Sequence, residues 1–334
     1  MRIEVYPHVA PDVLDREIQQ AAARELAWVI SEIMEGLLSL RPGLEECLSL
    51  LAPSQPGSTL VLSTSRSEGL KGFVTRVGSA IVKTDMQVKM HGLPHTKGLG
   101  YYRLQLAATA DTTVTTPSLP LPQLTDCRNF VHSALTLLPS DDSILAAKGL
   151  PFADRTATAL ADSKVLAHKL DAILSDIRAA RAILKSTPTA NLFPIHAAEA
   201  ALFDPPLPET LAVDVTIQDV AIVTELRLLE AAVPAGNTYA GFTAAIDSHL
   251  PSFNLRERFA GAFKRGGHHG GGGGGGGNRE NGGVVYRGVE VKVKERIRVE
   301  SQDPSLMSVM AKLGALEHNL AMGQTSLGIV MRSG

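Results

Sequence analysis

Four segments of the chain, far apart in sequence, repeat their apolar residues at steps of three and four, as amphipathic helices do. The first predicted helix runs from about residue 15 to 51, the second from 124 to 138, and the third over roughly 158–185. The fourth opens at Asp303-Pro304, a pair typical of an N-cap followed by a proline at the first helical position. Pro42 and Gly43 are expected to break or kink the first helix.

The apolar stripes of these helices are narrow and repeat about every 3.5 residues, as in helices that pack nearly parallel to one another. Burying one leucine of such a stripe contributes roughly 1.5–3 kcal/mol, so four stripes favour a bundle over four separate surface helices. We interpret the stripes as core rather than as a zipper for a partner. The predicted zipper or core residues are Leu124, Val131, Leu138, Leu166, Leu170, Ile173, Ile177, Leu306, Val309, Leu313, Leu316 and Leu320.

Other segments alternate apolar and polar residues, which is typical of antiparallel strands with one buried and one exposed face. Residues 211–217 alternate in this way, and the phase shifts near Asp219 before residues 220–228 alternate in turn. Residues 86–90 also alternate. They come after another predicted strand, which Gly72 and Gly78 bracket. The clearest case is 289–300, whose apolar face would hold Val289, Val291, Val293, Ile297 and Val299.

The order of these elements predicts an α+β fold. We expect an elongated, discontinuous antiparallel bundle of about four long helices, with the first and last helices together, and an antiparallel β-rich domain. The bundle would comprise residues 15–57, 118–203 and 301–330, and the β-rich domain residues 58–107 and 207–300. A Pro/Thr linker is expected at 108–122 and a disordered Gly-rich insertion at 266–283.

The Gly-rich stretch RGGHHGGGGGGGGNRENGG, residues 265–283, contains the pattern GxGxxG but lacks its context. A phosphate-binding loop needs a strand before it and a helix after it, whereas a predicted strand follows here. His268 and His269 supply too few ligands for zinc, which takes three or four. A coil of this composition and length has an end-to-end reach of roughly 20–25 Å. We therefore interpret the stretch as slack chain.

Candidate chemistry elsewhere is sparse, and we predict no catalytic residue, no metal site and no cofactor. His91 and His95 fall in a predicted surface turn, and His132, His168 and His318 in predicted helices without a recognisable cluster of ligands. The two cysteines, Cys47 and Cys127, are too few for a disulfide framework and favour a reducing compartment. An enzyme site assembled from scattered residues stays open as an alternative.

Charge and hydropathy limit the classes of partner. The formal net charge is −2, which provides no overall attraction to nucleic acid or to an anionic membrane. No segment approaches 18 continuous apolar residues and the N-terminus has no apolar signal region, so we expect a soluble cytosolic protein without direct membrane insertion.

One strand carries the candidate partner-binding residues. Opposite the apolar face of 289–300 lie Lys292, Lys294, Arg296 and Arg298, which either are solvated or contact a protein partner. Glutamates dilute this basic face and no aromatic residue interleaves it for base stacking, which disfavours nucleic acid. Strict alternation places Glu295 on the apolar face, as a bulge or an edge strand with an inward charge would explain.

Four stretches together resemble the Rogdi leucine-zipper family in the form found in fungi: residues 69–90, 121–138, 207–229 and 289–320. They occur in the family's order, and the resemblance covers most of the chain after about residue 15. The resemblance implies a helical bundle with a β-rich part and no catalytic activity. The Gly-rich insertion and the long Pro/Thr linker depart from the family pattern, and both fall in predicted loops.

The resemblance also implies a role. Fungal members belong to the RAVE complex, the regulator of the ATPase of vacuoles and endosomes, together with a large WD-repeat subunit and an F-box-adaptor protein. The implied function is a non-enzymatic adaptor that promotes assembly of the vacuolar proton pump through its peripheral sector, in the cytoplasm and recruited to vacuole or endosome membranes. The alternative is a generic coiled-coil scaffold with a different partner.

Overall fold

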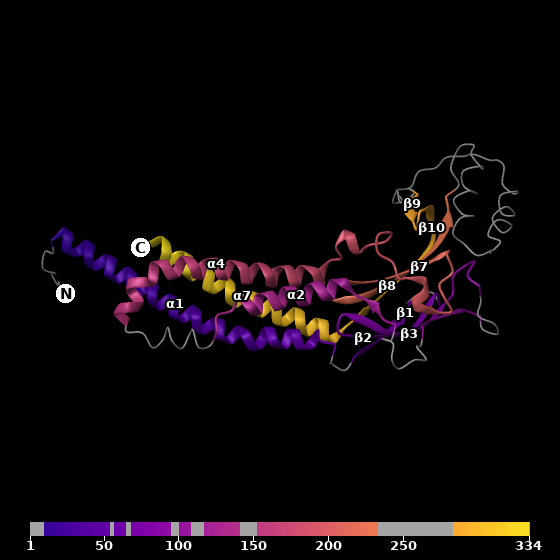
Figure 1. The fold of residues 1–334 in the computed structure, drawn as a ribbon, viewed down its shortest axis with the longest axis horizontal. Helices are drawn as coiled ribbons and strands as arrows, with labels where there is room; N and C mark the ends of the chain where they lie inside the picture. Colours follow the sequence, from indigo (N-terminus) through magenta and orange to yellow (C-terminus); the bar gives the residue numbers. More distant parts are fainter. Residues whose placement is uncertain are drawn as a thin grey trace, which may run out of the picture. The chain divides into compact units, whose positions relative to one another are not determined.

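Four long α-helices lie side by side in the described part of the chain, an antiparallel sheet lies at one end of them, and a second sheet is formed by later strands (Figure 1). This confirms the predicted α+β class. The computed structural model describes residues 10–53, 57–64, 68–94, 100–107, 117–140, 152–232 and 283–333, with the side chains of 152–161 and 333 left out. The helices are α1 (Pro11–Leu50), α2 (Pro122–Leu137), α4 (Phe152–Lys185) and α7 (Pro304–Ser333).

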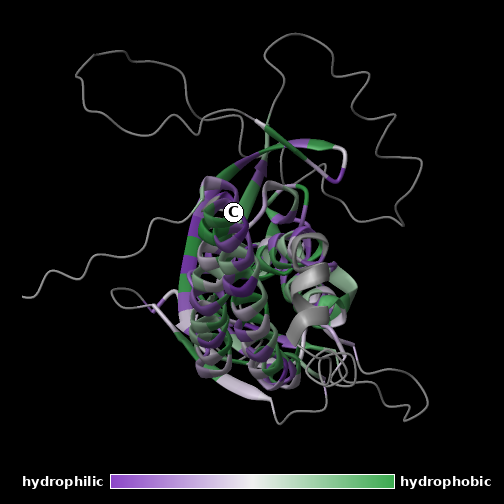
Figure 2. Ribbon diagram, turned by 90° about the vertical axis from the view of Figure 1, so that its left-hand side faces the viewer, coloured by the Kyte–Doolittle hydropathy of each residue, from purple (hydrophilic) through white to green (hydrophobic). Residues whose placement is uncertain are grey.

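The helices pack against one another through their apolar sides. α1 contacts α2, α4 and α7, and α4 also contacts α2 and α7. In the view along the helices, the helices carry both hydrophobic and hydrophilic residues, as expected where one side of a helix is buried (Figure 2). The first turn of α7 begins as predicted, because the carboxylate Oδ1 of Asp303 accepts the Ser305 N–H at 2.9 Å.

α1 corrects one half of the prediction at Pro42-Gly43, that the helix would break there, since the helix runs through both residues. Proline removes one helical hydrogen bond, but Leu37, Leu40 and Leu44 stay buried on both sides of it, and this packing holds the segment helical. Gly43 has a packing reason, because a Cβ there would lie 3.0 Å from Cδ2 of Leu316.

The first sheet has the order β1-β2-β3-β4-β6, with β5 paired to β3, and every pairing is antiparallel. Its strands are β1 (Ser58–Ser63), β2 (Leu70–Val77), β3 (Ala80–Val88), β4 (Tyr102–Leu106), β5 (Leu119–Pro120) and β6 (Phe203–Asp204). β5 lies inside the stretch predicted as a linker, of which residues 108–116 fall outside the described residues. The short 3-10 helices η1 (Thr189–Asn191) and η2 (Ala200–Leu202) precede β6.

The second sheet has the order β7-β8-β10-β9. Its strands are β7 (Leu211–Gln218), β8 (Ala221–Ala231), β9 (Val284–Tyr286) and β10 (Val289–Gln302). The chain divides into two compact units, residues 1–228 with 294–334 and residues 229–293. Within the second unit β9 pairs with the beginning of β10, and the Ala232 N–H donates to the Glu290 carbonyl at 2.8 Å. Residues 265–282 of the Gly-rich stretch lie outside the described residues, and the predicted domain boundaries stay a prediction.

β7 and β8 correct a second prediction. The alternating pattern predicted one buried and one exposed face, but both strands are buried on both faces over 211–217 and 221–229. The polar side chains Asp214, Glu225 and Arg227 are among the buried ones. Ion pairs within the sheet compensate these charges, which allows a nominally polar face to be buried. In β10, Val289 is half-buried and Val293 is 43% exposed, so two of its five predicted apolar-face residues are not buried.

The turn between β7 and β8 explains the shift of phase near Asp219. Asp219 and Val220 have φ angles of 47° and 66°, in the left-handed region used by tight hairpins. Their N–H groups donate to the carbonyls of Lys185 and Leu184 at 2.9 and 2.8 Å. These are carbonyls of the last turn of α4, which lack partners within the helix, so the hairpin caps α4.

Gln123, at the beginning of α2, closes the outer edge of β7. Its side-chain Nε2 donates to the carbonyl of Ile217 at 2.9 Å, and its Oε1 accepts the N–H of the same residue at 2.7 Å. The amide thus pairs with β7 as another strand would, and it is 2% exposed. Helix α2 and the second sheet are joined by a buried polar contact as well as by apolar packing.

Replacing Gln123 with leucine is expected to lower the free energy of unfolding by about 1–3 kcal/mol, because the Ile217 N–H then stays buried without a partner. Urea unfolding followed by circular dichroism measures this loss. The matched control is Gln87→Leu, since Gln87 is exposed on β3. Equal stability of the two variants would contradict the structural role of the Gln123 amide.

Candidate interaction surface

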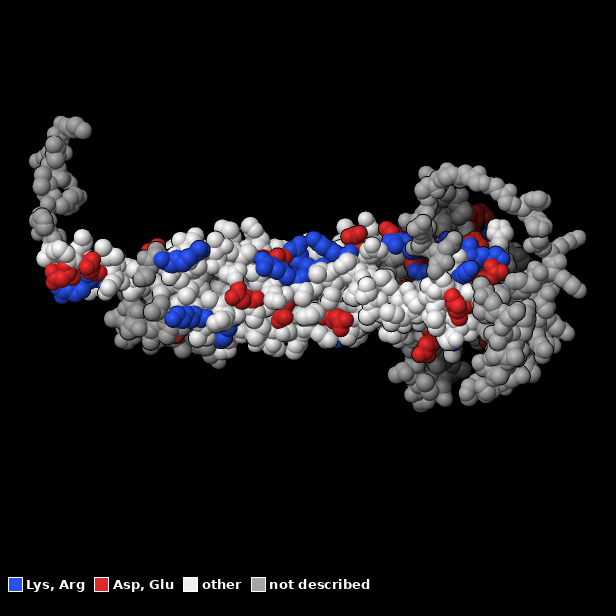
Figure 3. Space-filling view, turned by 90° about the horizontal axis from the view of Figure 1, so that it is seen from above, with Lys and Arg blue, Asp and Glu red and all other residues white. Residues whose placement is uncertain are grey.

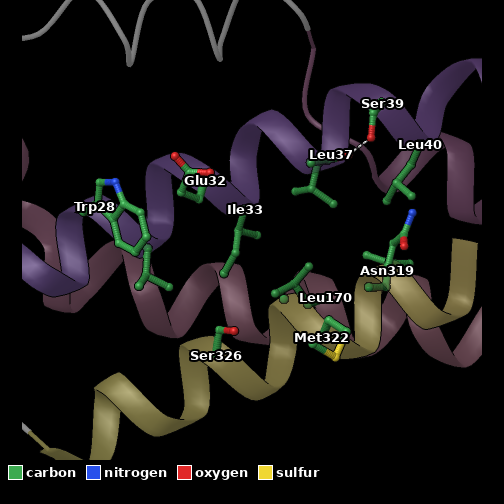
Figure 4. Close-up of a pocket in the computed structure, with 14 residues that line it drawn as sticks. Trp28, Glu32, Ile33, Leu37, Ser39, Leu40, Leu170, Asn319, Met322 and Ser326 are labelled. Carbon is green, nitrogen blue, oxygen red and sulfur yellow. Dashed lines mark hydrogen bonds between the residues drawn. The ribbon is translucent and has the colours of Figure 1, made fainter.

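A groove runs along the helices between α1 and α7, with α4 beneath it (Figure 4). Its floor is apolar and buried, and is formed by Ile33 and Leu37 of α1, Leu170 of α4 and Leu320 of α7. The hollow has a volume of about 430 Å³. The other lining residues are Trp28, Val29, Glu32, Gly36, Ser39, Leu40, Asn319, Met322, Gly323 and Ser326.

The rim of this groove is unusual because it exposes two large apolar side chains. Trp28 on α1 is 60% exposed and Met322 on α7 is 59% exposed. Figure 4 shows both along the groove, Trp28 on α1 and Met322 on α7. Apolar periodicity did not predict the site. Trp28 lies outside the predicted stripe of the first helix, which is Ile18, Ala22, Leu26, Val29, Ile33 and Leu37. Met322 lines the same groove only because α7 packs on α1.

All of the predicted zipper or core residues, which belong to the second, third and fourth predicted helices, are buried within this one chain. Leu306, Leu313 and Leu320 form one buried line on α7, which contacts α1 and α4. An intermolecular coiled coil needs such a line at the surface, so these leucines are not available as its seam.

The predicted basic residues lie exposed on β10, but they differ in their contacts. Arg296 pairs through Nε with the carboxylate of Glu225. Arg298 Nη2 pairs with the carboxylate of Glu300 at 2.7 Å and also donates to Gln218. For Lys292 and Lys294, no ion pair is present among the described residues. On the face shown in Figure 3, Lys and Arg are interspersed with Asp and Glu instead of forming one basic surface.

The carboxylate of Glu295, which the alternation placed on the apolar face, has a hydrogen-bond partner in the structure. Its Oε2 accepts the backbone N–H of His91 at 3.0 Å, in the turn that follows β3. The inward-facing carboxylate of β10 therefore fixes a turn from the first sheet. The ring of His91 is fully exposed, and His95 lies outside the described residues, so the described part of the pair offers no enclosed ligand site.

His196 is a titratable residue that sequence reasoning missed. Its Nδ1 lies 3.2 Å from Oδ1 of the buried Asp214, and Oδ2 of Asp214 lies 3.8 Å from Nη1 of Arg227. The Arg227 guanidinium also stacks on the Phe193 ring at 4.7 Å and pairs with Glu225. The hydrogen bond to Asp214 raises the pKa of His196 above its ordinary value of 6.5. No local sequence motif predicts the contact of His196, in a loop, with Asp214, in strand β7.

This geometry predicts a dependence of stability on pH. Because the native pKa of His196 lies above the unfolded value of 6.5, its pairing with Asp214 stabilises the fold fully below pH 6.5 and less as pH rises through the native pKa. The stability difference between the natural protein and His196→Gln should therefore shrink from about pH 5.5 to about pH 8.5. Urea midpoints across that range measure it, and a constant difference would contradict the pairing.

Nucleophilic and metal chemistry find little support in the described residues. Burial raises the pKa of the Cys47 thiol to about 11 and that of the Cys127 thiol to about 12, so neither is an activated thiolate at neutral pH. No three His, Cys, Asp or Glu side chains of the described ranges gather to hold a metal ion. His268 and His269 lie outside those ranges. None of the described helices combines the length and apolar character needed to cross a membrane.

Comparison with known proteins places these features in context. Residues 25–328 match the model of a family described as Rogdi leucine zipper containing protein. A protein of Schizosaccharomyces pombe, named "Regulator of V-ATPase in vacuolar membrane protein 2", is 23% identical over 321 residues. That alignment covers 88% of this chain and 89% of the S. pombe protein.

Proposed function

The chain belongs to the Rogdi leucine zipper family, and from this premise we propose that it regulates the vacuolar proton-pumping ATPase. The observation that carries the proposal is the alignment with a protein named as a regulator of V-ATPase, which extends over nearly the whole length of both chains. Because the alignment covers most of both chains, the similarity is not limited to one shared domain.

In the finer form of the proposal, the protein is a non-enzymatic adaptor of a RAVE-type complex. It acts with a large WD-repeat subunit and an F-box-adaptor protein on the peripheral sector of the pump, in the cytoplasm and at vacuole or endosome membranes. Three features of the described residues support an adaptor: the buried zipper stripes, the inert thiols and the open groove between α1 and α7. The exposed Lys292 and Lys294 are proposed as a further partner contact.

The proposal is tested by deleting the gene in its own host and measuring vacuolar pH together with the amount of peripheral sector that sediments with vacuolar membranes. We expect a higher vacuolar pH and less membrane-bound peripheral sector, both restored by the natural gene. A tagged chain should recover the WD-repeat subunit and peripheral-sector subunits from lysate. Normal acidification with normal sector assembly would overturn the proposal.

A further inference from the structure

We propose that the groove between α1 and α7 docks one helix of a protein partner, and that this helix has an apolar face flanked by Lys or Arg. The groove selects its occupant by shape and charge, whichever assembly the partner belongs to. Docking of such a helix is therefore tested separately from the role in pump regulation.

Two of the residues that line the groove are glycines in helix interiors, Gly36 on α1 and Gly323 on α7. A helical glycine lowers stability by about 1 kcal/mol relative to alanine, so one expects a packing reason for it. A Cβ on Gly36 would meet no atom within 4 Å, and one on Gly323 would make only an ordinary contact of 3.6 Å to Ile33. Packing within the chain therefore requires neither glycine. Their effect is to leave the groove open.

The shape of the groove favours a helix over a small molecule. On α1 the lining extends from Trp28 to Leu40, which is about 18 Å or a little over three helical turns. Small-molecule sites enclose about 70–90% of their ligand, whereas Trp28 and Met322 leave this rim open. An amphipathic helix fits a long open groove, because its residues at i, i+3, i+4 and i+7 insert from one side.

The charge of the groove defines the flanks of the partner. Glu32 is the one charged residue that lines it. Glu25 lies seven residues earlier and so on the same side of α1, and neither carboxylate has an ion pair among the described residues. A partner helix that places Lys or Arg beside these carboxylates gains two charge pairs, whereas an acidic helix is repelled.

The same charges disfavour a second copy of this chain as the occupant. α1 carries eight Asp or Glu residues against three Arg. A two-fold symmetric contact sets the same surface of both copies face to face, so it would bring two acidic α1 helices together. The favoured partner is therefore a different protein.

Trp28 makes the test direct, because it is the single tryptophan of the chain. The intact protein is titrated with a synthetic helical peptide of Leu, Ala and Lys, with leucines at i, i+3, i+4 and i+7 and lysines on both flanks. We expect the Trp28 emission to shift to shorter wavelength as the ring leaves water. A peptide with Glu in place of each Lys should bind about tenfold more weakly.

Matched variants assign the signal to the groove. Gly36→Leu fills open space, so it should fold normally and bind the Lys peptide at least about tenfold more weakly. Gly328→Leu, on α7 but outside the lining, should bind like the natural protein. Glu32→Lys should weaken the Lys peptide and strengthen the Glu peptide, which tests the charge argument even if Gly36→Leu were poorly folded.

Every other outcome overturns the proposal. No shift with either peptide excludes a helix site, and equal binding of both peptides excludes the charge selection. A shift with phosphatidylcholine vesicles and not with peptides would identify a lipid surface. A shift that appears with rising concentration of the protein itself would identify a second copy.

Discussion

Replacing Asp303 with alanine is expected to lower the free energy of unfolding by about 3–5 kcal/mol, the largest loss that we predict for one substitution. Oδ2 of Asp303 lies 2.5 Å from Nε of Arg76, and both side chains are almost fully buried. Removing the carboxylate leaves a buried guanidinium whose remaining partner is the carbonyl of Gly78 at 2.6 Å. It also removes the N-cap of α7.

Two further variants separate the charge from the cap. Asp303→Asn retains a side-chain oxygen for the Ser305 N–H, so it should lose less stability than alanine. Adding Arg76→Met to Asp303→Asn should recover much of the loss, because no uncompensated charge then remains buried. Lys312→Ala, which breaks the exposed pair with Glu46, should cost under about 1 kcal/mol. Urea unfolding measures all four, and a small loss for Asp303→Ala would contradict the buried pair.

Replacing Leu313 with alanine is expected to cost about 2–5 kcal/mol, because the side chain is fully buried between α7 and its neighbours and its removal leaves a cavity. Met307→Ala is the matched control on the same helix. Its side chain is 48% exposed, and we expect a change of less than about 0.5 kcal/mol. The measurement is again the free energy of unfolding in urea.

The Leu313 variant also distinguishes core from interface. If the leucines of α7 are core, Leu313→Ala lowers stability but leaves recovery of partners intact at temperatures where the variant is folded. A variant of normal stability that fails to recover partners would show that the stripe is an intermolecular zipper instead.

The candidate surfaces were predictable only in part. The exposed positions of Lys292 and Lys294 follow from strand alternation, since neighbouring side chains point to opposite faces. The pairing of Arg296 with Glu225 could not be predicted, because these residues are distant in sequence and meet only in the assembled sheet. The groove could not be predicted from the sequence for a similar reason. It lies between two helices at opposite ends of the chain, and its open volume depends on how they pack.

The sequence by itself determined the four helices and the strands β2, β3, β7, β8 and β10, because apolar periodicity is a local property that reports which side of an element is buried. It also determined the N-cap at Asp303, where the interacting groups lie two residues apart. Only the tertiary structure decided that β7 and β8 are buried on both faces, that α1 continues through Pro42, and that His196 meets Asp214. Each of these depends on the free energy of contacts between distant segments, which outweighs the local preference of the residues involved.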